Sequence, residues 1–341
     1  MRFLATTLFL VGSHLLAGSS ARGLEFETNA FTSSGTANPT DDNYVFVPSQ
    51  PASPARLLLF FPGSGSSLFQ YTTFLQHAAT RGYYVIGLAY RNEHSPAGLC
   101  GCMAACMGEL EHQNVSGVDN GFYSADASAG ITPALNSVNY RLHAFLDHLN
   151  AAHIGGGFDW SQFWYAPGDH PYWSRIVVAG HSGGGSMATW ILKNSNAVAA
   201  IAFSAPSIIL DADQPGPAMS GVTPYYVGGA KGTCSSWLNF APPSWVTPGF
   251  GAHLMVYDDS RDTAYTGSWA GHDIPIVVNT IGGLTELLFS DGGTPSGRWI
   301  TRTDDTTGCT GANPHHGEPV ANCGLDHHGV WNYLLDKALT F

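Results

Sequence analysis

RIVVAGHSGGGSMATWIL, residues 175–192, is the stretch of sequence that decides the fold. An apolar run is followed by a glycine-rich turn centred on Ser182 and then by a helix-forming segment, which gives the motif G-x-S-x-G between a strand and a helix. Because the chain contains 41 glycines, the motif alone is weak evidence for a catalytic serine. The strand before it and the helix after it make it strong evidence. Small neighbours permit a cramped turn. The helix N-terminus favours developing negative charge. We therefore predict that Ser182 is a catalytic nucleophile; the alternative is a structural glycine-rich turn.

The N-terminal segment has the composition of an export signal. The basic start at residues 1–2 is followed by a mostly apolar run over residues 3–16 and by small residues at 17–21. This order is typical of a secretory signal peptide, residues 1–21, cleaved near Ala21. The apolar run is too short to span a membrane comfortably, and no later segment is long enough. We expect a secreted protein, extracellular or periplasmic, with no membrane span; the alternative is a buried N-terminal helix.

The six cysteines fit an oxidising compartment, because an even number in an exported chain favours disulfides. Cys309 and Cys323 bracket one segment and form the pair that is easiest to propose. One of the three cysteines near residue 100 could pair with Cys234, but six cysteines allow 15 connectivities. The alternative for the first cluster is a zinc site. The cysteines are Cys100, Cys102, Cys106, Cys234, Cys309 and Cys323.

Composition favours one catalytic domain over residues 22–341. Charged residues make up 11% of the chain and the formal net charge is −12, which argues against nucleic acid or an anionic membrane as a partner. Aromatic residues make up 12%, including nine tryptophans, which suits apolar or sugar-like ligands as well as an ordinary core. The oligomeric state stays open.

Strand and helix patterns alternate along the chain, which predicts an α/β fold with a mostly parallel sheet covered by helices on both faces. Continuous apolar runs such as residues 56–61 are typical of buried parallel strands. Two long loop insertions, residues 92–128 and 207–251, interrupt the alternation and are candidates for the binding pocket. We expect strands at 44–47, 56–61, 83–90, 176–179, 197–203, 254–257 and 298–303, and helices at 68–80, 131–150, 185–192 and 330–339.

With this elbow and this order of elements, the chain resembles the α/β-hydrolase superfamily from about Tyr44 to Leu339. Several stretches also look similar to a little-characterised group of bacterial secreted serine-hydrolase-like proteins whose substrates are not settled. The stretches are LFFPGSG at 59–65, GYYVIGLAY at 82–90, LC at 99–100, RL at 141–142 and WSRIVVAGHSGGG at 173–185.

The resemblance implies a catalytic triad in the chain order serine, acid, histidine. A serine needs a base within hydrogen-bond reach and a carboxylate that orients the base. The acid follows a late strand in this superfamily, which points to Asp262, with Asp259 as the alternative. The alternative for the neighbouring aspartates is a structural role in a solvated turn, where they could pair with Arg261.

The base usually precedes the last helix in this superfamily. We expect His328, which lies just before the predicted helix at 330–339, with His327 and His316 as alternatives and His315 as a further candidate. The adjacent histidine pairs could instead bind a metal with Glu318 or Asp326, but nothing in the sequence makes these ligands converge. We therefore expect no metal and no cofactor.

The resemblance also implies an oxyanion hole made of two backbone N–H groups. One belongs to Gly183, the residue after the nucleophile. The other comes from the loop after the early strand, where Ser64 is the expected donor. Pro62 stands where many relatives have histidine, and the alternative for this loop is a plain strand-end turn.

The expected function is a secreted serine hydrolase that cleaves small or polymeric carboxylic esters through an acyl-enzyme. A peptidase or acyltransferase with the same triad and a non-catalytic binding protein are the alternatives.

Overall fold

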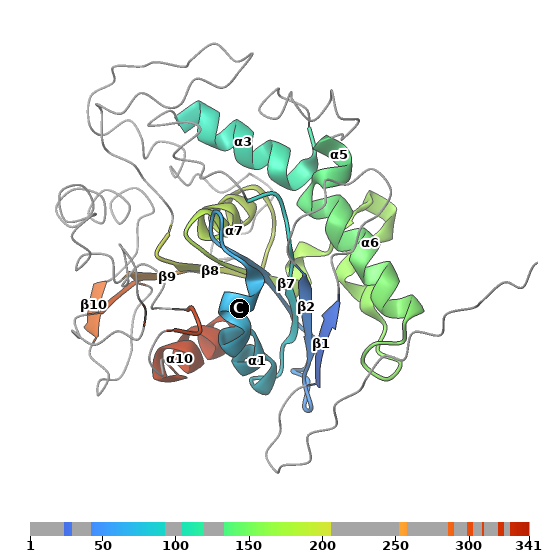
Figure 1. Ribbon diagram of the computed structural model, residues 1–341, viewed down its shortest axis with the longest axis horizontal. Helices are drawn as coiled ribbons and strands as arrows, with labels where there is room; N and C mark the ends of the chain where they lie inside the picture. Colours follow the sequence, from blue (N-terminus) through green and yellow to red (C-terminus); the bar gives the residue numbers. More distant parts are fainter. Residues whose placement is uncertain are drawn as a thin grey trace, which may run out of the picture.

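The computed structural model describes residues 24–28, 42–92, 104–118, 133–205, 252–257, 286–289, 299–302, 309, 320–323 and 328–340. Nine of the strands within these residues form one sheet, with helices on either side of it (Figure 1). The nine strands are β1 (Leu24–Thr28), β2 (Asn43–Val47), β3 (Leu57–Phe61), β4 (Tyr84–Gly87), β7 (Ile176–His181), β8 (Ala199–Phe203), β9 (Ala252–Tyr257), β10 (Glu286–Phe289) and β11 (Trp299–Arg302).

The strands lie in the order β1-β2-β4-β3-β7-β8-β9-β11-β10. β2 pairs antiparallel with both of its neighbours, and every other neighbouring pair is parallel. Parallel strands need long crossover connections, and helices supply those that follow β3, β4 and β7. The predicted α/β fold class, a mostly parallel sheet with helices on both faces, is confirmed.

The described helices include five α-helices of nine or more residues and the 3₁₀ segment η1, which leads into α1. They are η1 (Leu68–Tyr71), α1 (Thr72–Thr80), α3 (Ala104–Ser116), α6 (Val138–Ala151), α7 (Gly183–Asn194) and α10 (His328–Leu339). The shorter ones are α5 (Pro133–Asn136), η2 (Trp160–Phe163), η3 (Ala166–Gly168) and η4 (Trp173–Arg175). A separate two-stranded ribbon joins β5 (Trp164–Tyr165) to β6 (His170–Pro171). None of the described helices is long and apolar enough to cross a bilayer.

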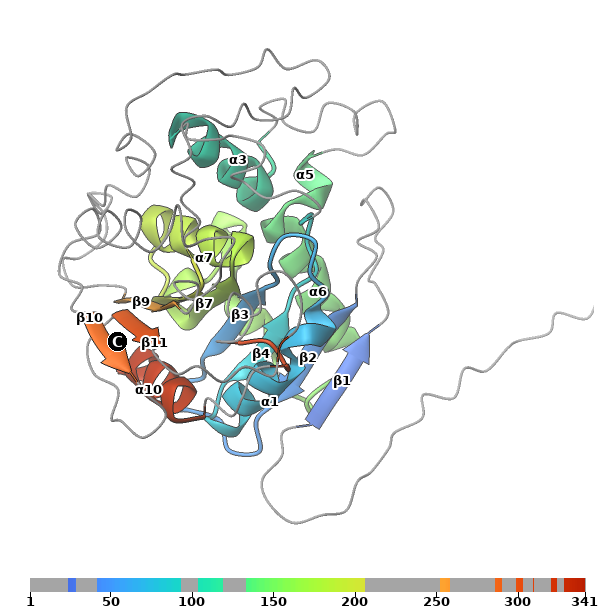
Figure 2. The ribbon, with the colours of Figure 1, turned by 60° about the vertical axis from the view of Figure 1, so that its left-hand side comes forward.

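Alternation along β3 divides the apolar core into two layers. Leu58 and Phe60 belong to the layer beneath α1 and α10, whereas Leu57, Leu59 and Phe61 belong to the layer beneath α6 and α7. Because successive side chains of a strand point to opposite faces, β3 is buried on both sides and its sequence is apolar throughout. Figure 2 shows α1 and α10 together on one side of the sheet and α6 and α7 on the other.

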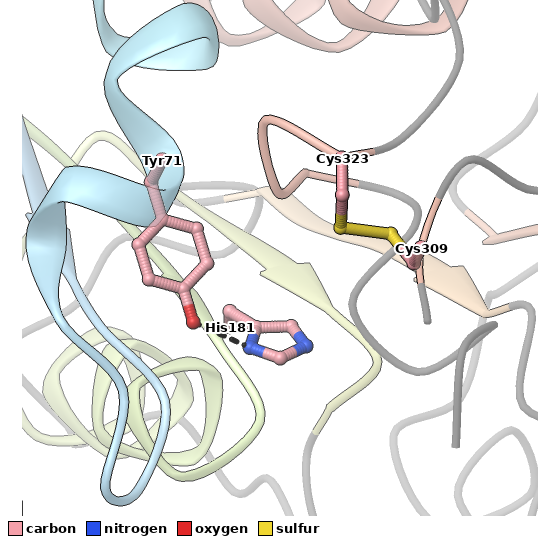
Figure 3. The surroundings of a disulfide bond; sticks show 4 residues. All are labelled: Tyr71, His181, Cys309 and Cys323. Atoms are coloured by element: carbon pink, nitrogen blue, oxygen red, sulfur yellow. Dashed lines mark hydrogen bonds between the residues drawn. A yellow bond between two sulfur atoms is a disulfide. The ribbon is translucent and has the colours of Figure 1, made fainter. Parts of the chain in front are cut away.

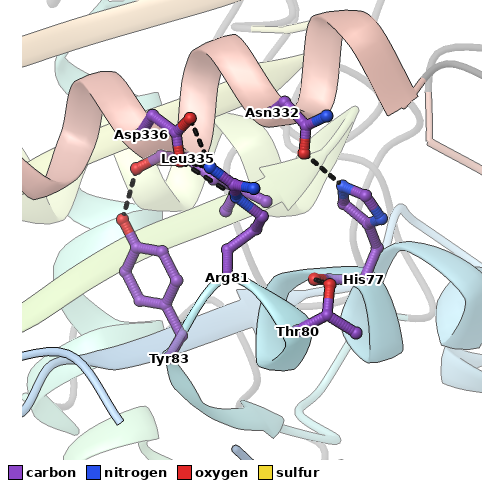
Figure 4. A network of polar contacts seen from close by, with 7 residues as sticks. All are labelled: His77, Thr80, Arg81, Tyr83, Asn332, Leu335 and Asp336. Carbon is purple, nitrogen blue, oxygen red and sulfur yellow. Dashed lines mark hydrogen bonds and ion pairs between the residues drawn. The ribbon is translucent and has the colours of Figure 1, made fainter. Parts of the chain in front are cut away.

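Polar contacts join α1 and the residues just after it to α10 (Figure 4). His77 Nε2 lies 2.9 Å from Asn332 Oδ1. Arg81 contacts both carboxylate oxygens of Asp336. The buried Tyr83 hydroxyl donates to the Leu335 carbonyl at 2.7 Å. These contacts fix the C-terminal helix against a helix that is about 250 residues earlier in the chain.

The predicted elements differ from the observed ones at identifiable places. The single helix expected over 131–150 is broken at Ser137, whose hydroxyl accepts from the Tyr140 N–H and caps α6. The helix expected over 68–80 begins as the 3₁₀ segment η1. β1 and β10 lie where we expected no strand. The insertion 92–128 was expected to be a long loop, but it contains the 13-residue helix α3.

α3 packs outside α6 and α7 and adds a further layer above that face of the sheet. His112 stacks on Trp190 of α7 with ring centroids 5.8 Å apart. Glu111, on the same helix, is completely buried. Within the described residues its Oε1 has no hydrogen-bond partner, and its Oε2 has only a 3.5 Å contact from Asn114. Burial therefore raises the pKa of Glu111 to about 8.

This buried carboxyl predicts a pH-dependent stability. Between pH about 4.5 and about 8 the unfolded chain ionises this group while the folded chain keeps its proton. The free energy of unfolding therefore falls as pH rises through that window, by an amount on the order of a few kcal/mol. Glu111→Gln removes the titration. The free energy of unfolding of the wild type should therefore fall relative to that of the variant from pH 5 to pH 8, as measured by urea denaturation. Glu109→Gln, an exposed change on the same helix, is the control. Parallel pH profiles for wild type and Glu111→Gln would contradict the prediction.

Candidate active site

Ser182 lies in a strained turn between β7 and α7. Its backbone has φ 50° and ψ −118°, which a residue with a side chain rarely adopts. Such a conformation costs on the order of 1–3 kcal/mol and persists only where the surroundings enforce it. The Ser182 N–H donates to the Phe203 carbonyl of β8 at 2.9 Å, and its carbonyl accepts from the Ser186 N–H at 3.0 Å. The predicted strand, elbow and helix are confirmed.

Three glycines around the serine make this turn sterically feasible. A Cβ on Gly180 would overlap the backbone of Gly184, and one on Gly184 would overlap the Phe61 and Pro62 carbonyls. A Cβ on Gly185 would overlap Ala205. The missing side chains allow α7 to start directly against the ends of β3 and β8. The motif therefore needs glycine for close backbone approach as well as for flexibility.

The loop after β3 lies against the elbow. A Cβ on Gly63 would stand 3.4 Å from the Ser182 Cβ. β3 and β7 are parallel neighbours, so both loops leave the same edge of the sheet. The helices that follow them, α1 and α7, turn to opposite faces. In open α/β sheets ligands bind at this kind of switch point, outside the carboxyl ends of the strands.

Hydrogen bonds hold most of the polar backbone of this loop. The Tyr90 hydroxyl donates to the Pro62 carbonyl at 3.1 Å. Asn92 Nδ2 donates to the carbonyls of Gly63 and Ser66 at 2.7 and 2.9 Å, and the Asn92 carbonyl accepts from the Gly65 N–H at 2.6 Å. The loop is thus held by residues of the segment that follows β4.

The two predicted oxyanion donors lie at this junction. Within the part of the chain that the structure describes, neither the N–H nor the buried hydroxyl of Ser64 has a hydrogen-bond partner. Gly183 is the first residue of α7, so its N–H has no acceptor inside the helix. The arrangement offers hydrogen-bond donors beside a serine at the positive end of a helix.

Tyr71 and His181 are two buried residues of the site that the sequence analysis missed. The Tyr71 hydroxyl accepts from the Gly63 N–H at 3.3 Å and lies 2.9 Å from His181 Nδ1 (Figure 3). This pair joins the loop after β3 to the residue before the nucleophile. His181 was visible as the second position of the motif, but no sequence signal pairs residues that are 110 positions apart.

The predicted acids Asp262 and Asp259 lie outside the described residues, as does Arg261. β9, the strand that precedes them, is parallel to β8 and ends at Tyr257. Its carboxyl end therefore lies at the same edge of the sheet as the end of β7. Asp262 as the triad acid stays a prediction.

His328 is the first residue of α10, rather than part of a loop before a helix at 330–339. His315, His316 and His327 lie outside the described residues, as do Glu318 and Asp326. The role of His328 as the base stays a prediction.

The disulfide predicted between Cys309 and Cys323 is confirmed, with the two Cα atoms 4.7 Å apart. Figure 3 shows it beside the Tyr71–His181 pair. Cys100, Cys102 and Cys234 lie outside the described residues, and Cys106 belongs to α3.

The chain matches no protein-family model and no curated protein. Solved structures with similar folds include esterase 2 of Thermogutta terrifontis phosphorylated by paraoxon, at 14% identity and TM-score 0.38 over 88% of this chain and 85% of that chain. TT1662 of Thermus thermophilus has 14% identity and TM-score 0.40 over 94% and 99% of the two chains. The uncomplexed acylaminoacyl peptidase of Pyrococcus horikoshii has 14% identity and TM-score 0.43 over 94% of this chain and 42% of that chain. These similarities are low, so we take the fold from the strand order and argue the activity from the site itself.

The glycine packing predicts a selective penalty at Gly184. Gly184→Ala should lower the free energy of unfolding by at least about 1–3 kcal/mol, because the new methyl group meets backbone atoms that cannot rotate away. It should also displace the loop that carries Ser64. Gly108→Ala in α3 is the matched control, since a Cβ there meets nothing within 4 Å. The control should be neutral or up to about 1 kcal/mol more stable. Equal denaturation midpoints for the two variants would refute the close approach.

Proposed function

We propose that the protein is a secreted serine hydrolase that cleaves carboxylic esters through an acyl-enzyme. The observation that carries this proposal is Ser182 in a strained backbone conformation at the N-terminus of α7, where Gly183 is the first helical residue. Ser64 lies in the neighbouring loop, and its buried hydroxyl has no hydrogen-bond partner among the residues that the structure describes. A strained turn at this place costs stability without improving the packing of the core, which is expected of a catalytic group. A purely structural turn would gain from relaxing it.

In the acylation step, Ser182 Oγ attacks the ester carbonyl carbon while the base histidine takes the hydroxyl proton. The carbonyl oxygen becomes an oxyanion, which the N–H groups of Ser64 and Gly183 stabilise together with the α7 dipole. The histidine then returns the proton to the leaving alkoxide, and the C–O bond of the ester breaks. The products are an alcohol and an acyl group on Ser182.

Deacylation repeats the sequence with water as the nucleophile. The base removes a proton from water, hydroxide attacks the acyl carbon, and the proton is returned to Ser182 Oγ as the carboxylic acid leaves. We assign His328 as the base and Asp262 as the acid that orients it. β9 supports the acid assignment because it ends at the edge of the sheet where β7 ends.

Secretion is part of the proposal. The leader-like residues 1–21 and the disulfide between Cys309 and Cys323 support it, since disulfides persist in oxidising compartments. N-terminal sequencing of the exported protein tests the cleavage near Ala21. A panel of p-nitrophenyl esters of increasing acyl length, run beside peptide substrates, tests the preference for esters over amides.

Ser182→Ala should abolish ester hydrolysis and leave the fold intact, because only the nucleophilic oxygen is removed. Loss of a triad member lowers turnover by about 10⁴- to 10⁶-fold. Steady-state kinetics on a p-nitrophenyl ester measure the loss, and circular dichroism checks the fold. Turnover near the wild-type level in the purified variant would refute Ser182 as the nucleophile.

The base should give the activity a single acid-side ionisation. An imidazole must be neutral to accept the serine proton, and its unperturbed pKa is about 6.5. The kcat/KM value should therefore rise with pH through the neutral range and level off above it. His328→Ala should remove most of this activity, whereas His327→Ala and His316→Ala should retain it. If one of those two variants loses activity and His328→Ala does not, the base is that residue instead.

A further inference from the structure

Asn322 connects the C-terminal segment to the junction between η1 and α1. Its Nδ2 donates to the Phe69 carbonyl at 2.6 Å and to Thr72 Oγ1 at 3.0 Å. Its Oδ1 accepts from the Thr73 N–H at 2.8 Å, and its own N–H donates to the Gln70 carbonyl at 2.5 Å. One short side chain and its backbone therefore make four hydrogen bonds to a segment about 250 residues earlier.

These bonds replace a cap that α1 lacks. The N-cap residue of α1 is Tyr71, whose side chain makes no capping bond. The first turn of a helix has N–H groups without partners in the helix, and a polar side chain normally satisfies one of them. Asn322 supplies that oxygen to Thr73 from a distant part of the sequence. Most of these contacts are exposed to water, so their main effect is to fix positions, with a modest contribution to stability.

Asn322 lies close in the sequence to the candidate bases. Asn322 precedes Cys323, which is joined to Cys309, and α10 begins at His328. All four candidate histidines, from His315 to His328, lie within about seven residues of Asn322 in the sequence. The contacts of Asn322 therefore anchor the chain six residues before His328, which we assign as the base.

The other side of the same junction leads to the nucleophile. Tyr71 ends η1, and its hydroxyl contacts both the Gly63 N–H and His181, the residue before Ser182. The η1–α1 junction is thus bonded to the base-bearing segment through Asn322 and to the elbow through Tyr71. Figure 3 shows the Cys309–Cys323 disulfide beside the Tyr71–His181 pair, and Asn322 is the residue before Cys323 in the sequence.

We infer that Asn322 is a positioning residue of the hydrolase, which sets the place of the base-bearing segment relative to Ser182. The inference rests on the proposed function. Catalysis requires the base within hydrogen-bond reach of the serine, and a misplacement of about 1 Å can cost about 100-fold in rate. Asn322 affects the rate through the position of another group and does not itself contact the reacting atoms.

Asn322→Ala tests the inference, with Asn332→Ala as the matched control. Both substitutions remove an asparagine that links the C-terminal region to α1, but Asn332 contacts His77 at the outer surface. Asn322→Ala should lower kcat by about 10- to 100-fold and leave KM within about twofold, because the base is displaced while the substrate site is retained. Asn332→Ala should leave kcat unchanged at a comparable melting temperature.

Asn322→Asp is the second variant and decides the case if Asn322→Ala does not fold. Aspartate keeps an oxygen that accepts from the Thr73 N–H, at the helix end that favours negative charge. It loses the two hydrogen bonds that Asn322 Nδ2 donates to Phe69 and Thr72. Its kcat should lie between those of the wild type and the alanine variant, or below the wild type where only aspartate folds. Three results would overturn the inference: an unchanged kcat in the folded variants of Asn322, an equal loss of kcat in Asn332→Ala, or a change confined to KM.

Ser182→Ala, measured in parallel, separates this inference from the proposed function. If Ser182→Ala is inactive and Asn322→Ala is fully active, the positioning role is wrong and the hydrolase proposal stands. If Ser182→Ala retains activity, the proposed function is wrong and the positioning role fails with it.

Discussion

The strained backbone of Ser182 is the constraint on which the rest of the site depends. Its φ of 50° places the serine between the ends of β7 and α7. This is feasible only because Gly180, Gly184 and Gly185 have no Cβ atoms where three backbone segments meet. The strain is maintained by the hydrogen bond to Phe203 and by the buried core beneath the sheet. The cost of the turn is a local loss of stability, and the benefit is a hydroxyl held at the positive end of a helix.

The elements around this turn come from separate parts of the chain and are bonded to one another. The loop after β3 is clamped by Tyr90 and Asn92, and Tyr71 joins it to His181. Asn322 then attaches the C-terminal segment to the helix that starts at Thr72. The Cys309–Cys323 disulfide closes that segment covalently. Such a network favours preorganisation, in which donors and reacting groups keep their positions without rearrangement during the reaction.

The sequence predicted the central strands, the elbow and the disulfide because each follows from a local rule. Apolar runs specify buried parallel strands, and glycines around a serine specify the turn. The sequence did not predict β1, which pairs at the sheet edge, or α3, whose buried residues include the ionisable Glu111. It also missed Tyr71, Asn92 and Asn322, since their roles depend on contacts that no local sequence pattern indicates. The acid and the base were inferred from a resemblance alone, so they remain predictions.

The most direct test of the account is covalent labelling of the wild-type protein with a fluorophosphonate, followed by peptide mapping of the adduct. An activated serine beside donors for a developing oxyanion should react with this probe in a single position. The account predicts one adduct per chain on Ser182, formed faster above neutral pH than at pH 5 because the base must be unprotonated. An adduct on Ser64 or another serine, or no adduct in correctly folded protein, would contradict it.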